Sequence, residues 1–151
     1  MAIDLILAIL HHLLIFMLAG TLAGEFVLLR PGLAGRDLKL LAHLDSAYGG
    51  LAGAIILIGV GRVFFGLKGW EFYVYSWSFW AKMAAFVAVG LLSVSPTMRI
   101  ARWRKEARSV KGTYVVPDHE ITAARTFLRL EVLVFALIPI FAAMMARGVG
   151  Y

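Results

Sequence analysis

Long apolar segments alternate with shorter polar stretches along the chain. The four apolar segments cover residues 3–29, 40–65, 77–100 and 121–146. Each is longer than the ~20 residues that a helix needs to cross a hydrocarbon core of ~30 Å. None shows the short alternating runs of membrane strands. The pattern predicts an all-α polytopic membrane protein, a bundle of four transmembrane helices that forms a single domain over residues 1–151.

Composition agrees with this pattern. Hydrophobic residues make up 62% of the chain, whereas a soluble domain has about half. We expect the first segment to be a transmembrane helix and not a signal peptide, because no basic region precedes it and Arg30-Pro31 is not a small-residue cleavage site. The chain has no cysteine, so we expect neither a disulfide nor a thiolate metal site.

Positive charge is concentrated in two of the three connections. The net charge is +6, from 15 Lys and Arg against 9 Asp and Glu. The basic residues in question are Arg30, Arg36 and Lys39 after the first segment, and Arg99, Arg102, Arg104, Lys105, Arg108 and Lys111 after the third. The positive-inside rule then predicts that both connections are cytoplasmic and that both termini lie outside the cytoplasm. Basic side chains beside a membrane contact anionic lipid headgroups, and we expect no nucleic-acid partner.

Glycine is frequent in the second segment. Residues 48–62 read YGGLAGAIILIGVGR, in which Gly49 and Gly53 form a GxxxG pair. Such a pair lets a neighbouring helix backbone approach closely. We expect tight helix packing here, with room for a flat cofactor as the second interpretation. The pair permits a homodimer as readily as packing within the chain.

Four side chains that do not suit lipid are predicted at one depth. Ionisable groups inside a bilayer cost ~2.5–3.5 kcal/mol each on insertion scales and normally face the bundle interior. With a rise of ~1.5 Å per residue, His11 and His12 lie about as far from the outer surface as Arg62 and Lys82 do. These residues come from three different helices, and carboxylates accompany them only at the rim. The layer therefore predicts a site for an anionic or electron-rich guest.

The adjacent histidines point about 100° apart on a helix, so His11 and His12 cannot both face the bundle axis. One of them is expected to be the inward residue, and the sequence leaves open which. Haem iron takes a histidine nitrogen, and four-helix bundles hold cofactors on facing side chains. The alternative is a histidine that only forms an interhelical hydrogen bond. A zinc or copper site is disfavoured because the histidines show no HxxxH spacing.

A second polar cluster is expected near the cytoplasmic helix ends, consisting of Glu25, Arg30, His43, Arg129 and Glu131. Acids and bases are mixed in it. We therefore expect interhelical ion pairs, in which Glu25 or Glu131 binds an arginine of the fourth segment (Arg125 or Arg129). A second polar site is the alternative.

Several short motifs give the chain a family resemblance. They are a His-Leu pair early in the first helix (His12-Leu13), a basic residue at its end (Arg30), Trp80-Ala81-Lys82 at the start of the third helix, the basic connection, and FLRLEV over residues 127–132. The chain resembles a family of small, uncharacterised four-helix integral membrane proteins of bacteria. More distantly it resembles the HemJ-type protoporphyrinogen oxidases and the CopD-like membrane domains of copper resistance.

The HemJ resemblance implies a haem b protein of the bacterial inner (cytoplasmic) membrane. It implies that His12 or His11 is the axial ligand and that Lys82 is the functional lysine of the third helix. Arg129 and Glu131 would match the polar cluster that opens the family's last helix.

Three functional hypotheses follow. The first is a haem-b-binding redox protein that oxidises a porphyrinogen-like substrate, with Lys82 in the catalytic role, Arg62 and Lys82 holding carboxylates, and a quinone or a partner protein as electron acceptor. The second is a non-enzymatic accessory or assembly subunit of a larger membrane complex. The third and weakest is a metal-ion transport module, suggested by the CopD-like resemblance and by scattered methionines.

Overall fold

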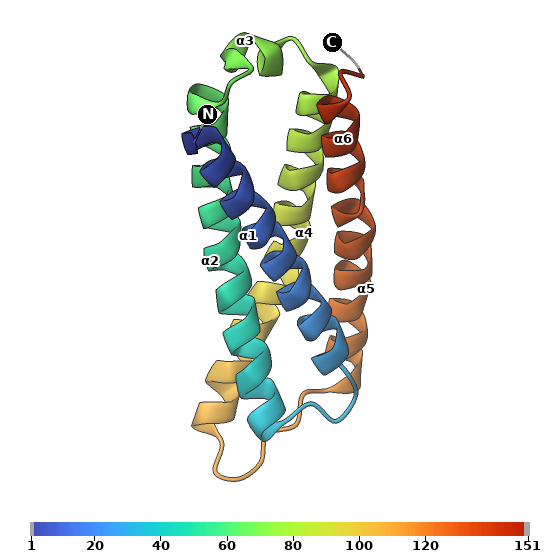
Figure 1. The fold of residues 1–151 in the computed structure, drawn as a ribbon. Coiled ribbons are helices and arrows are strands. Elements are labelled where there is room, and N and C mark those ends of the chain that lie inside the picture. The colour runs from blue at the N-terminus through green and yellow to red at the C-terminus, as the bar shows by residue number, and fades with distance from the viewer. Residues whose placement is uncertain (1, 150–151) are drawn as a thin grey trace.

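The computed structural model describes residues 2–149. Its helices are α1 (Ala2–Leu28), α2 (Gly35–Phe65), α3 (Gly69–Val74), α4 (Trp77–Ser109), α5 (Asp118–Phe135) and α6 (Leu137–Ala146) (Figure 1). Four stretches are long and apolar enough to span a membrane: α1, α2, α4, and α5 with α6. The all-α, four-span prediction is confirmed.

The fourth span is broken once. α5 ends at Phe135 and α6 begins at Leu137. Pro139 explains the break, because its ring lacks an amide hydrogen and clashes with the carbonyl four residues earlier, that of Phe135. The two helices continue in nearly the same direction (Figure 1).

The helices extend beyond the apolar segments at the charged end. α4 was expected to end near residue 100, yet it continues to Ser109. Its last turns therefore carry the basic residues on a helix and not on a loop. Charged residues one turn apart support such an extension, as Arg102 and Glu106 do with 4.0 Å between Nε and Oε1.

The bundle consists of two helix pairs. α1 packs along α2, and α4 packs along α5 and α6, while α2 and α4 join the pairs. Among the described residues, no Cα atom of α1 lies within 8 Å of one in α4 or α6. Both ends of the described chain and α3 lie at one end of the bundle, which we call the terminal end (Figure 1). The connections α1–α2 and α4–α5 lie at the other, the basic end. That the basic end is cytoplasmic stays a prediction.

Side-chain packing is concentrated toward the basic end. Trp103, Leu41 and Ala124 are completely buried there. Large apolar side chains elsewhere point outward, and Phe16, Leu57 and Leu91 have at least 70% of their surface exposed. Such exposure would be unfavourable in water, but it suits helices that face lipid.

Within residues 2–149, Gly49 and Gly53 do not mediate tight packing, and the homodimer that this pair also permits stays a prediction. A Cβ atom at either position would meet no atom within 4 Å. The close approaches of α1 to α2 occur at other glycines. A Cβ atom at Gly24 would lie 2.8 Å from Leu44 Cδ1, and one at Gly59 would lie 3.6 Å from His11 Cε1. The spacing of a GxxxG pair does not say which side of the helix faces a neighbour.

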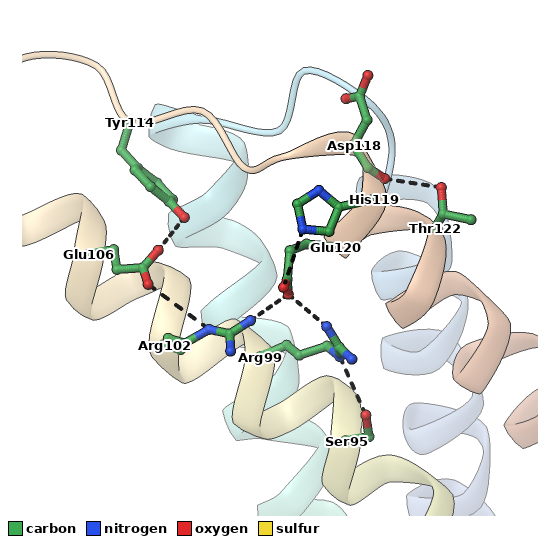
Figure 2. Close-up of polar contacts among 9 residues, drawn as sticks. All are labelled: Ser95, Arg99, Arg102, Glu106, Tyr114, Asp118, His119, Glu120 and Thr122. Carbon is green, nitrogen blue, oxygen red and sulfur yellow. Dashed lines mark hydrogen bonds and ion pairs between the residues drawn. The ribbon is translucent and has the colours of Figure 1, made fainter.

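An ion-pair cluster fastens α4 to the start of α5 (Figure 2). Arg99 Nη1 donates to Glu120 Oε2 at 2.7 Å, and Arg102 Nη2 donates to the same oxygen. Glu120 is only 19% exposed, so these charge-assisted bonds are partly shielded from water.

The two connections at the basic end also bind each other. Val116 N donates to Leu33 O at 3.0 Å, and Arg125 Nη1 donates to Leu29 O at 2.7 Å. The Tyr114 hydroxyl donates a hydrogen bond to the carboxylate of Glu106. Burial, reinforced by this bond, raises the pKa of Tyr114 to about 12. The phenol therefore keeps its proton and its bond at neutral pH.

We predict that Glu120→Gln lowers the free energy of unfolding by about 1–2 kcal/mol, because two partly shielded charge-assisted bonds are lost. Reversible unfolding in mixed detergent micelles measures this. Asp37→Asn is the matched control, since Asp37 forms one exposed pair with Arg30 at 3.5 Å. Its expected effect is below ~0.5 kcal/mol. Equal effects of the two substitutions would contradict the role assigned to Glu120.

Candidate functional site

The two adjacent histidines of α1 have different surroundings. His12 is exposed, and its Nδ1 donates to Ala8 O at 2.7 Å, one turn earlier in the same helix. His11 is partly buried against α2, and its Nδ1 is buried without a hydrogen-bond partner. Since a carbonyl oxygen only accepts, the His12 proton is on Nδ1. His11 is therefore the residue that faces the interior, which resolves the choice that the sequence left open.

Two cationic side chains lie near His11. Lys82 comes from α4 and Arg62 from α2, and both act electrostatically on the His11 ring. Neither forms an ion pair with any residue in the range 2–149, and Arg62 Nε is buried without a partner. We call His11, Arg62 and Lys82 the basic triad. The structure thus brings together three of the four residues predicted for the outer layer and leaves His12 outside.

Helix α3 lies at the terminal end and packs against α2 and α4, which carry Arg62 and Lys82 (Figure 1). Gly69 has φ +73°, a conformation that glycine adopts without strain, and it lets the chain turn into α3. Tyr73 is the buried residue of α3, with 7% of its surface exposed. Its ring contacts Phe79 at 5.6 Å between centroids, and Lys82 Nζ lies 5.5 Å from the Phe79 centroid.

Tyr73 also interacts with Arg62. Burial raises the pKa of Tyr73 above its ordinary value, and Arg62 opposes this shift only in part. The hydroxyl therefore remains a protonated donor beside the basic triad at neutral pH. The sequence signal for this role was weak, because Tyr73 lies in a run of aromatic residues typical of an interfacial belt. Its neighbours Trp70 and Tyr75 are indeed exposed.

The second predicted polar cluster is divided by the structure. Glu25 and Glu131 are buried, with 3% and 1% of their surface exposed. Arg30, His43 and Arg129 are exposed. Arg30 pairs with Asp37, and His43 Nδ1 donates to Lys39 O at 2.7 Å. Two of the five residues therefore come together in the interior.

The predicted ion pairs of these glutamates are absent. Within residues 2–149, neither Glu25 nor Glu131 pairs with a basic side chain. Arg129 precedes Glu131 by two positions, which places them about 200° apart around the helix. Arg125 binds Leu29 O instead, and its guanidinium lies 4.9 Å from the centroid of the Phe26 ring.

Acidic and hydroxyl groups surround the two glutamates instead. Glu25 of α1 interacts electrostatically with Glu131 of α5 and with Asp45 of α2. Tyr48, one turn after Asp45, interacts with Glu131 through its side chain. Thr97 Oγ1 of α4 donates to Asp45 Oδ1 at 2.6 Å.

We call the carboxyl groups of Glu25, Asp45 and Glu131 the acidic cluster, with Tyr48 and Thr97 as its hydroxyl neighbours. Sequence reasoning missed both hydroxyl residues. The spacing of Tyr48 from Asp45, three positions on one helix face, was the available signal.

Neither the basic triad nor the acidic cluster has the geometry of a metal centre built from several side chains. Within the described residues, no group of three or more His, Cys, Asp or Glu is placed to hold a metal ion. A haem needs only one histidine nitrogen from the protein. His11 supplies an unpartnered nitrogen, and the basic triad supplies two cations for carboxylates, so these residues fit that group.

The fold and the buried polar groups define an integral membrane protein with four spans. Residues 3–150 match the model of a family described as predicted membrane protein (DUF2214), and the chain belongs to that family. This confirms the resemblance to a family of small membrane proteins. No curated protein and no solved structure matches the chain. The haem-binding role that the HemJ resemblance implies stays a prediction.

We predict that Lys82→Met stabilises the protein purified without a guest by on the order of 1 kcal/mol, because it removes an unpaired, partly buried cation next to Arg62. Thermal unfolding in detergent measures the change. Lys105→Met, at an exposed position beyond the apolar part of α4, is the control and should leave the melting temperature unchanged. A clear loss of stability in Lys82→Met would show that Lys82 has a structural partner.

Proposed function

We propose that the protein binds haem b in the terminal half of the bundle and acts as a membrane redox protein. One observation carries the proposal: His11 presents an unpartnered ring nitrogen beside Arg62 and Lys82, two cations without carboxylate partners. Buried cations without partners are costly. A guest that brings carboxylates and an electrophilic metal would satisfy all three side chains at once.

The side chains have separate roles in this proposal. His11 would hold the iron through a ring nitrogen, and Arg62 and Lys82 would bind the two propionates by charge-assisted hydrogen bonds. The Tyr73 hydroxyl would donate a hydrogen bond to the same anionic groups.

The resemblance to HemJ-type enzymes suggests the reaction. Haem supplies one-electron chemistry, whereas the protein supplies orientation and electrostatics. Oxidation of a porphyrinogen-like substrate releases electrons and protons, and the electrons would pass to a quinone or to a partner protein. In the alternative arrangement Lys82 would bind a substrate carboxylate in place of a propionate and act as the catalytic lysine.

We predict a Soret band and sharp reduced α and β bands in the visible spectrum of protein purified from haem-replete cells. His11→Ala should abolish these bands, because it removes the ligand. His12→Ala is the matched control and should retain them, since His12 is bonded to its own helix. Arg62→Gln and Lys82→Met should weaken haem retention without removing it. A colourless wild type, or bands that depend on His12, would overturn the proposal.

A second candidate is an accessory subunit of a larger membrane complex. An open groove of about 570 Å³ runs between α1 and α2, lined by small and apolar residues including Gly20, Ala47 and Gly50. A Cβ atom at Gly20 or Gly50 would meet nothing within 4 Å. Small residues on an outer face suit packing against another membrane helix. A colourless protein that co-purifies in fixed ratio with another membrane protein would favour this candidate.

A further inference from the structure

We propose that Glu25 and Glu131 form a membrane-embedded proton-binding site, which exchanges its protons through Asp45 and Thr97. The ligand is the proton itself. The proposal concerns the acidic cluster in the basic half of the bundle and does not depend on haem binding in the terminal half.

The geometry gives this site two unsatisfied acceptors. Glu25 and Glu131 are both more than nine-tenths buried, and each has one carboxyl oxygen, Oε1, without a hydrogen-bond partner. Their side chains approach from α1 and α5 and interact with each other. A buried acceptor that lacks a donor is unfavourable, and a proton on either carboxyl group would supply the missing donor.

In the part of the chain that the structure describes, no basic side chain pairs with the two glutamates. α2 contributes Asp45 and Tyr48, and α4 contributes the Thr97 hydroxyl. Arg99 of α4 and Arg125 of α5 are engaged elsewhere, since Arg99 binds Glu120 and Arg125 binds Leu29 O.

Three carboxyl groups in a region of low dielectric constant cannot all be ionised together at acceptable cost. Protonation makes these carboxyl groups neutral without a basic side chain or a metal ion.

A metal ion is a poorer ligand for this site than a proton. No group of three or more acidic or histidine side chains in residues 2–149 is arranged to hold a metal. The Asp45 oxygen nearest α4 is already bonded to Thr97, and Tyr48 is engaged with Glu131. Ca²⁺ takes six to eight oxygen ligands, which these residues do not offer.

Asp45 and Thr97 provide the route for exchange. Thr97 is exposed and Asp45 is partly exposed, whereas both glutamates are enclosed. In this proposal a proton that enters at Asp45 passes to the two buried glutamates, with both of which Asp45 interacts electrostatically. Chains of buried carboxyl groups serve as proton relays in membrane pumps and transporters. The acidic cluster likewise consists of carboxyl groups inside a membrane bundle.

Infrared spectroscopy of the full-length protein in liposomes tests the proposal. The carbonyl stretch of a protonated carboxyl group is resolved from the carboxylate bands, and it shifts in heavy water. We expect this band at neutral pH, a reduced band in Glu25→Gln and in Glu131→Gln, and none from this site in the double variant. Glu71→Gln, at an exposed position in α3, is the control and should leave the band unchanged.

Thermal unfolding of the same variants provides a second readout. Glutamine is neutral and close in shape to a protonated glutamate, so each single variant should keep the wild-type melting temperature. Absence of the carbonyl band in the wild type would overturn the proposal, as would a band that neither substitution reduces. A melting temperature that rises with added Na⁺ or Ca²⁺ and loses this response in Glu25→Gln would assign the site to a metal cation instead.

Discussion

A hydrocarbon core offers no partner for a charge, and this constraint organises the interior of the bundle. Unpaired cations and unpaired acids occupy two separate levels. His11 and Glu25 are 14 residues apart on α1, which corresponds to ~21 Å along a helix. Tyr48 and Arg62 have the same spacing on α2. Because opposite charges at that separation cannot form ion pairs, neither level can neutralise the other. We propose an anionic guest for the basic triad and protons for the acidic cluster because neither group has a partner of opposite charge within residues 2–149.

The two levels differ in how tightly their surroundings are packed. The core is densest near the basic end, where Leu41 and Trp103 are completely buried and the ion pairs of Glu120 join α4 to α5 (Figure 2). At the terminal end, α1 packs on α2 but not on α4 or α6 within the described chain. Elements with few packing contacts open most easily. The terminal half is thus the less tightly packed part, and it is there that we propose a guest binds, while the carboxyl groups of Glu25 and Glu131 in the basic half are enclosed.

The sequence predicted the all-α class and the four membrane spans, because the length of an apolar segment indicates both. It did not predict the short helix α3 or the break between α5 and α6. Nor did it predict where α4 ends, since hydropathy marks only the apolar part of a helix and the charged residues after it continue the same helix. The prediction of ion pairs for Glu25 and Glu131 was wrong. The spacing of two residues along α5 places Arg129 on a different side of the helix from Glu131. The inward histidine could not be chosen from sequence, since the choice depends on where Gly59 lets α1 approach. The role of Tyr73 was not predicted because its burial depends on how α3 packs against α2 and α4.

The proposed binding site depends on the approach of His11 and Lys82 to one another in the interior, and cross-linking measures this approach. The chain has no native cysteine, so pairs of cysteines can be introduced without other changes. A short bifunctional thiol reagent applied to membranes should join His11→Cys to Lys82→Cys. It should fail with His12→Cys and Lys82→Cys, because position 12 faces away. Efficient cross-linking of position 12 but not of position 11 would contradict the basic triad and the binding site built on it.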